Sequence, residues 1–124
     1  MNNTNISKVG VILYALVVGF FGVNHFINAN GMAPMVPSFF PGGVFWVYLT
    51  GVALIAAAVS FITGKWTKLA GILLAVFLII VVLTVHLPAV IHAPDENAAR
   101  FPMTNLIKDT GLAAAALILA GRSA

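Results

Sequence analysis

Four long apolar runs constrain this chain more than any other feature of its sequence. The clearest of them, residues 44–63, has 20 residues and contains no Asp, Glu, Lys or Arg. As an α-helix, such a run crosses a hydrocarbon core about 30 Å thick, because each residue rises about 1.5 Å. No run alternates polar and apolar residues, and each far exceeds the roughly 10 residues of a membrane barrel strand. The runs therefore predict membrane-spanning helices.

We expect helices at about residues 8–27, 44–63, 68–87 and 105–121, which would form an all-α, integral membrane four-helix bundle. They use most of the 124 residues, so residues 1–124 are predicted to be a single domain. A mean hydropathy of +1.08 with only 7% charged residues excludes an ordinary soluble domain. The first run lacks a small-x-small cleavage site, so we expect it to be retained as a helix rather than removed as a signal peptide.

The distribution of charge predicts an up-down topology with both termini in the cytoplasm. Four of the six basic residues fall on one side of this arrangement, which the positive-inside rule assigns to the cytoplasm: Lys8, Lys65, Lys68 and Arg122. All six prolines fall in the two longer connections on the other side, about residues 28–43 and 87–104. The basic residues are scattered and form no patch, so the pI near 9.7 does not indicate a nucleic-acid partner. The expected partner is a lipid bilayer.

Polar residues inside or beside the apolar runs mark the candidate site. Asp109 lies in the fourth run, and an ionisable group at helix depth costs several kcal/mol, so it indicates function by default. In the up-down arrangement, the other polar residues within the runs are expected at the same outer end of the molecule as Asp109. We expect Asp109 to be the catalytic candidate and the others to bind a cofactor or ligand: Asn24, His25, His86 and Asn105.

The chemistry of this cluster has two interpretations, and the sequence leaves both open. Asp109 is predicted to lie in the first two turns of its helix, where the helix dipole stabilises a carboxylate by roughly 0.3–1 kcal/mol. An imidazole paired with that carboxylate could transfer a proton or bind the hydroxyl of a quinone. Alternatively, His25, His86 and Asp109 hold the helices in register, or Lys108 and Asp109 form an interfacial ion pair.

A soft-metal site is a weaker interpretation of the outer loops. Thioether and imidazole groups favour Cu(I). The available side chains are Met32, Met35, His86, His92 and Met103. This set is small, and Met in a Pro-rich loop is typical of a hydrophobic plug, so no metal ligand is assigned. The chain has no Cys, which excludes disulfides and thiol redox chemistry.

Four stretches of the sequence resemble the DoxX family: GVNHF (22–26), MVP through FP (35–41), WVYLTGV (46–52) and NLIKD (105–109). The resemblance covers most of the chain and implies a small four-helix protein of the bacterial inner membrane. That family takes its name from a subunit of a quinone-reducing thiosulfate oxidoreductase, and its members occur beside redox enzymes. Many members carry a Glu where this chain has Leu54, which implies a smaller polar site here.

We therefore expect a membrane component or accessory of a quinone-linked redox system with an outward-facing polar pocket. Asp109 would accept a proton or anchor the ligand, His25 and His86 would hydrogen-bond a quinone head group, and Asn105 would orient it. The alternatives are a non-enzymatic assembly or chaperone-like partner and a small transporter or metal-handling protein. A membrane or redox protein, or a second copy of the chain, is the expected partner.

Overall fold

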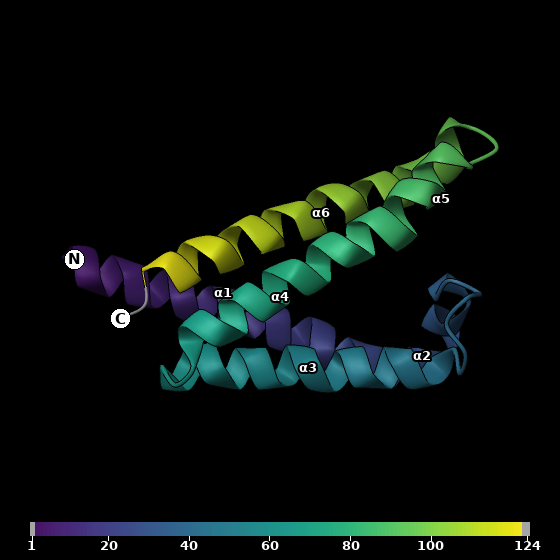
Figure 1. Ribbon diagram of the computed structural model, residues 1–124. Coiled ribbons are helices and arrows are strands. Elements are labelled where there is room, and N and C mark those ends of the chain that lie inside the picture. Colours follow the sequence, from purple (N-terminus) through teal and green to yellow (C-terminus); the bar gives the residue numbers. More distant parts are fainter. Residues whose placement is uncertain (1, 123–124) are drawn as a thin grey trace. The chain divides into compact units, whose positions relative to one another are not determined.

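The computed structural model describes residues 2–122, and this part of the chain is all-α, without strands (Figure 1). Its elements are α1 (Asn3–Ile27), α2 (Ala29–Met32), η1 (Ala33–Met35), α3 (Val44–Thr63), α4 (Thr67–Val81), η2 (Val82–His86), α5 (Leu87–Ile91) and α6 (Glu96–Gly121). Four helical segments are long and apolar enough to cross a membrane: Asn3–Ile27, Val44–Thr63, Thr67–Ile91 and Glu96–Gly121. The all-α prediction is confirmed.

Three of the predicted helices differ from the structure at one end, and capping explains the first difference. The helix expected to begin at residue 8 begins at Asn3, because the Asn2 side chain accepts a hydrogen bond from the Asn5 N–H at 2.8 Å. The helix expected to end at residue 87 continues to Ile91 through a π turn. The helix at 44–63 has the predicted bounds.

The largest correction concerns α6, which begins at Glu96 rather than at residue 105. Asp95 Oδ1 accepts a hydrogen bond from the Ala98 N–H at 2.8 Å, and Glu96 places a negative charge in the first turn. Pro102 suggested a loop, but it lies inside the helix. A proline there removes one backbone donor, and the strong N-cap and the helix-forming residues before it outweigh that loss.

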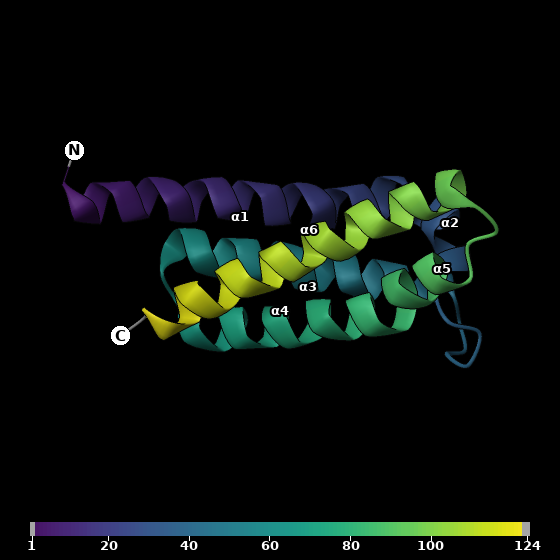
Figure 2. The ribbon, with the colours of Figure 1, turned by 90° about the horizontal axis from the view of Figure 1, so that it is seen from above.

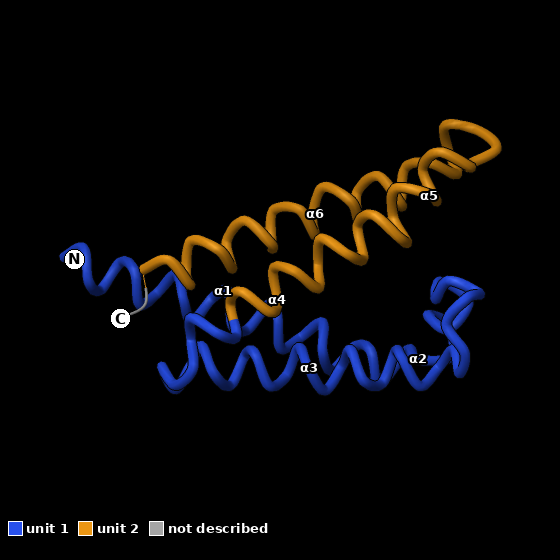
Figure 3. The backbone as a smooth tube through the Cα atoms, in the orientation of Figure 1, with its two compact units in different colours: residues 1–70 blue, residues 71–124 orange. Residues whose placement is uncertain are grey.

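The chain divides into two compact units, residues 1–70 and residues 71–124 (Figure 3). In unit 1, α1 and α3 lie side by side and are connected through α2 and η1 (Figures 1 and 2). Their backbones approach most closely at Gly22 and Gly51, where a Cβ on either glycine would lie 3.0 Å from the carbonyl oxygen of the other. Small residues let membrane helices pack this closely.

Unit 2 is a second helical hairpin, in which α4, η2 and α5 pack along α6. A Cβ added to Gly71 would lie 2.8 Å from the Ala116 carbonyl oxygen and 3.0 Å from the Ala120 Cβ. Ala75 and Ala116 are fully buried in this seam. Each unit therefore relies on close backbone contact through small residues. The prediction of one four-helix domain stays a prediction.

We expect Gly51→Ala to destabilise the protein by about 1–3 kcal/mol, because the new methyl group would overpack the α1–α3 seam. Its Cβ would lie 2.8 Å from Phe26 Cε2 and 3.1 Å from His25 Cβ. The matched control is Gly10→Ala, where no atom lies within 4 Å of the new Cβ. Thermal unfolding in mild detergent measures both variants. A Gly51→Ala protein as stable as Gly10→Ala would contradict the close approach.

Candidate functional site

A π turn places His86 inside unit 2. The Leu87 N–H donates to the Val82 carbonyl across five residues, so η2 is wider than the helices on either side. The cause is Pro88, which has no N–H to donate to the carbonyl four residues earlier. π turns inside helices occur frequently at functional sites. Here the turn carries His86 to a position where only 6% of its surface is exposed.

His86 and Asp109 form a buried hydrogen-bonded pair. His86 Nε2 lies 2.8 Å from Asp109 Oδ2, and Asp109 is also only 6% exposed. The two residues are 23 positions apart and come from η2 and α6. Burying two ionisable groups is costly unless they pair with each other. The prediction that Asp109 and His86 belong to one site is therefore supported by direct contact.

Lys108 completes this cluster from the same helix as Asp109. Its Nζ lies 3.4 Å from Asp109 Oδ1, and its side chain is 36% exposed. The two carboxylate oxygens thus have different partners, with an ammonium group at Oδ1 and an imidazole at Oδ2. An ionised carboxylate can only accept hydrogen bonds, so the His86 Nε2–H is the donor to Asp109 Oδ2 in the pair with the Asp109 carboxylate. This assignment fixes the protonation of the imidazole at Nε2.

The other imidazole nitrogen, Nδ1 of His86, is buried and has no hydrogen-bond partner among residues 2–122. With the proton on Nε2, Nδ1 of the neutral ring is an acceptor, and it becomes a donor when the ring is protonated. A buried polar atom without a partner is uncommon in proteins and calls for an explanation such as a bound ligand or water. Nδ1 is therefore the atom of this pair whose hydrogen-bonding capacity is unused among residues 2–122.

The remaining predicted site residues make local contacts. His25 Nδ1 lies 2.6 Å from the Phe21 carbonyl, which can only accept, so the proton of that imidazole is on Nδ1. Asn24 accepts a hydrogen bond from the Asn28 side chain one turn later. His25 and Asn24 belong to unit 1, and their place in a shared site with Asp109 stays a prediction. Asn105 is half-buried one turn before Asp109 on α6.

The helix-dipole argument for Asp109 is wrong. Because α6 begins at Glu96, Asp109 lies about three and a half turns into the helix rather than in its first two turns. The dipole effect is confined to the terminal turn. The charge of Asp109 is instead supported by Lys108 and His86. The sequence did carry a signal for this, since Asp95 is followed by residues that favour helix.

Two features of the site escaped the sequence analysis. They are the π turn, which ends next to Pro88 near the end of the third apolar run, and the unpartnered Nδ1 of His86. A proline in that position indicates a change in backbone hydrogen bonding, but it does not indicate which way the histidine points.

No group of three or more His, Cys, Asp or Glu side chains in the described part of the chain could hold a metal ion.

Comparison with known proteins leads to one family. The model of a domain of unknown function, DUF8561, matches residues 14–120. Neither the curated proteins nor the solved structures gave a match to this chain.

The DoxX assignment is wrong, because the family model that matches is that of DUF8561 and no DoxX model does. The stretches that suggested DoxX include Gly22 and Gly51, whose backbones touch, and such small residues are needed wherever two membrane helices pack closely. The match runs from α1 through nearly all of α6, so it includes both hairpins and the His86–Asp109 pair, and the chain belongs to the DUF8561 family.

Proposed function

We propose that this protein is a multi-pass protein of the bacterial inner membrane whose four long helices form an up-down bundle with both termini in the cytoplasm. The support is the charge pattern, because Lys8, Lys65, Lys68 and Arg122 would share the cytoplasmic side. Asp95 and Glu96 would lie on the outer side, at the start of the fourth span. A membrane protein partner or a second copy of the chain completes the proposed assembly.

We further propose that the His86–Asp109 pair binds a small hydrogen-bonding ligand and exchanges a proton with it. The observation that carries this proposal is the buried, unpartnered Nδ1 of an imidazole whose other nitrogen is held by a carboxylate. Asp109 orients the ring and stabilises it when it is protonated, as a carboxylate does for a general base. His86 Nδ1 then accepts a hydrogen bond from a ligand hydroxyl or, once protonated, donates one to a ligand carbonyl.

A quinone head group is the ligand class that fits this chemistry best. It carries carbonyl oxygens in its oxidised form and hydroxyl groups in its reduced form, so it can use both protonation states of Nδ1. It is also soluble in the membrane, where the helix that bears His86 is expected to lie. The proposed role is a membrane component of a quinone-linked redox system, in which electrons come from a separate redox partner.

One observation favours a second, non-enzymatic role. The pair joins η2 to α6 across the hairpin, so it also holds the two arms of unit 2 together. In that case the pair is structural, and the protein serves as an assembly partner for another membrane protein. Hydrogen bonds between membrane helices contribute about 0.6 kcal/mol on average, so losing a purely structural pair would cost little stability.

We expect His86→Gln to weaken binding of decylubiquinone by about tenfold, the loss of about 1.4 kcal/mol that a buried hydrogen bond to ligand provides. Gln keeps a polar side chain but cannot exchange a proton near neutral pH. The matched control is His92→Gln, because His92 is exposed in the same unit. Isothermal titration of purified protein in mild detergent measures the affinity. Equal affinity in His86→Gln and the wild type would remove the ligand proposal.

Asp109→Asn separates the ligand role from the structural one. Asn has nearly the shape of Asp and keeps hydrogen-bonding capacity, so the hairpin should melt within about 1 kcal/mol of the wild type. If Asp109 supports a protonated His86, the variant should lose quinone binding at that nearly unchanged stability. Melting and binding are measured on the same preparations. Wild-type binding in Asp109→Asn would leave only the structural role.

The orientation is tested by single cysteines, because the chain contains none of its own. We expect Asn97→Cys to react with an impermeant maleimide in intact cells, since residue 97 is exposed at the start of α6 and would lie outside. Lys65→Cys, in the turn between α3 and α4, should react only after the membrane is permeabilised. The opposite labelling pattern would invert the proposed topology.

A further inference from the structure

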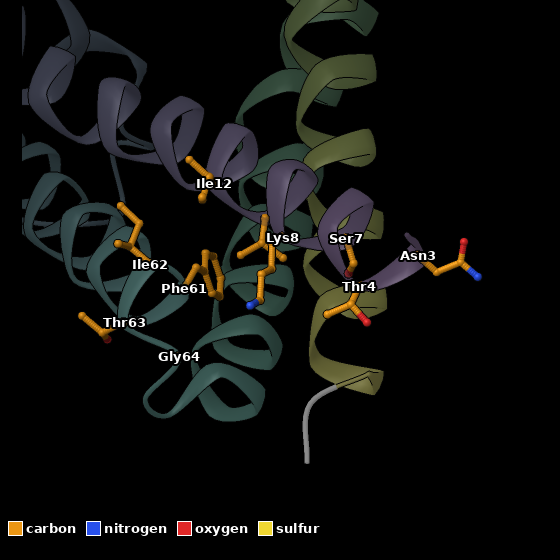
Figure 4. Close-up of a pocket in the computed structure, with 10 residues that line it drawn as sticks. Asn3, Thr4, Ser7, Lys8, Ile12, Phe61, Ile62, Thr63 and Gly64 are labelled. Carbon is orange, nitrogen blue, oxygen red and sulfur yellow. The ribbon is translucent and has the colours of Figure 1, made fainter. Parts of the chain in front are cut away.

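Unit 1 contains a cleft between the first turns of α1 and the end of α3, with a volume of about 590 Å³ (Figure 4). Thr4, Ser7, Lys8 and Val11 line it from α1, and their spacing of three and four residues places them on one helix face. Phe61 and Ile62 line it from α3. The two helices therefore build a surface that changes from polar to apolar along one face of α1.

The lining of the cleft has the two-part chemistry of a phospholipid. Thr4 and Ser7 offer hydroxyl groups next to the Lys8 ammonium group, whereas the deeper residues, Val11 and Phe61, are hydrocarbon. In Figure 4 the Lys8 side chain extends beside Phe61, and Ser7 and Thr4 follow it toward the start of α1. Lysine side chains at a membrane surface commonly place their stem on apolar groups and their charge in the headgroup layer.

The charge of unit 1 specifies an anionic headgroup. Residues 1–70 contain Lys8, Lys65 and Lys68 but no Asp or Glu, because all three acidic residues of the chain lie in unit 2. Trp66 is 77% exposed in the turn that follows α3, at the same end of the hairpin as the cleft. Exposed Trp is typical of the membrane–water interface. With Trp66 at that interface, the cleft would lie at the depth of the lipid phosphates.

We propose that this cleft is a binding site for one anionic phospholipid, with its phosphate at Lys8, Ser7 and Thr4 and an acyl chain along Val11, Phe61 and Ile62. A free phosphate ion would use only the polar part and leave the apolar part uncovered. A phospholipid uses both. The cleft is formed by residues of unit 1, whereas the His86–Asp109 pair is formed by residues of unit 2.

Native mass spectrometry of the detergent-solubilised full chain tests the proposal, with dioleoyl phosphatidylglycerol and dioleoyl phosphatidylcholine as the two probes. We expect the first phosphatidylglycerol to bind more tightly than phosphatidylcholine. Lys8→Gln should weaken phosphatidylglycerol binding by about fivefold, the factor expected for one lysine at a membrane surface. The matched control is Lys65→Gln, which removes an exposed lysine from the same unit outside the cleft and should leave binding nearly unchanged.

A second variant tests the acyl-chain part of the cleft. Ile12 lines the cleft and is 49% exposed, so Ile12→Trp should fill part of the space without disturbing the α1–α3 seam. We expect this variant to bind both phospholipids less tightly. Equal losses in Lys8→Gln and Lys65→Gln would show diffuse attraction instead of a site. Competition by glycerol phosphate as effective as that by the whole lipid would show a phosphate site and overturn the lipid assignment.

Discussion

The structure depends on one constraint: in a membrane, every backbone N–H and C=O must find its partner within the protein. Helices meet this demand internally, which is why the four apolar segments are helical along nearly their whole length. The hydrophobic effect cannot then hold two such helices together, because lipid is as apolar as they are. Close contact at Gly22 and Gly51, and at Gly71 and Ala116, provides the packing instead. The small residues of these seams are therefore the positions that least tolerate added volume.

The same constraint explains the site. Pro88 deprives one backbone carbonyl of its donor, and the helix accommodates this loss with a π turn rather than a break. The wider turn moves His86 out of the regular helical pattern and into contact with Asp109. An imidazole and a carboxylate can remain buried there because each satisfies the other, and Lys108 supports the second carboxylate oxygen. Among the described residues of this pair, the atom left without a hydrogen-bond partner is His86 Nδ1, and the proposed ligand would bind there.

The all-α fold class could be predicted from the sequence, because an apolar run of about 20 residues without charges has few possible structures other than a membrane-spanning helix. The sequence also singled out Asp109, Lys108 and His86, because ionisable residues are costly inside apolar helices, and the structure shows that these side chains are in contact; their role as a site stays a prediction. The predicted start of the fourth helix was wrong, because Pro102 suggested a loop. The helix is capped by Asp95 and begins at Glu96, so Pro102 lies inside it. The π turn could not be predicted for another reason: a proline indicates a local change in backbone hydrogen bonding but does not determine the geometry of the new turn. The family assignment was wrong because it rested on short stretches, whereas the DUF8561 model matches residues 14–120.

The two proposed sites differ in the physical origin of their binding energy. The cleft acts through the exposed ammonium group of Lys8, and attraction between exposed charges weakens as salt is added. The His86–Asp109 pair acts through a buried hydrogen bond, which salt screens much less. Burial also means that a ligand at Nδ1 must leave water to reach it, which suits a membrane-soluble molecule. If both proposals hold, binding at the cleft should respond to ionic strength and lipid composition, and binding at the His86–Asp109 pair should respond mainly to the ligand itself.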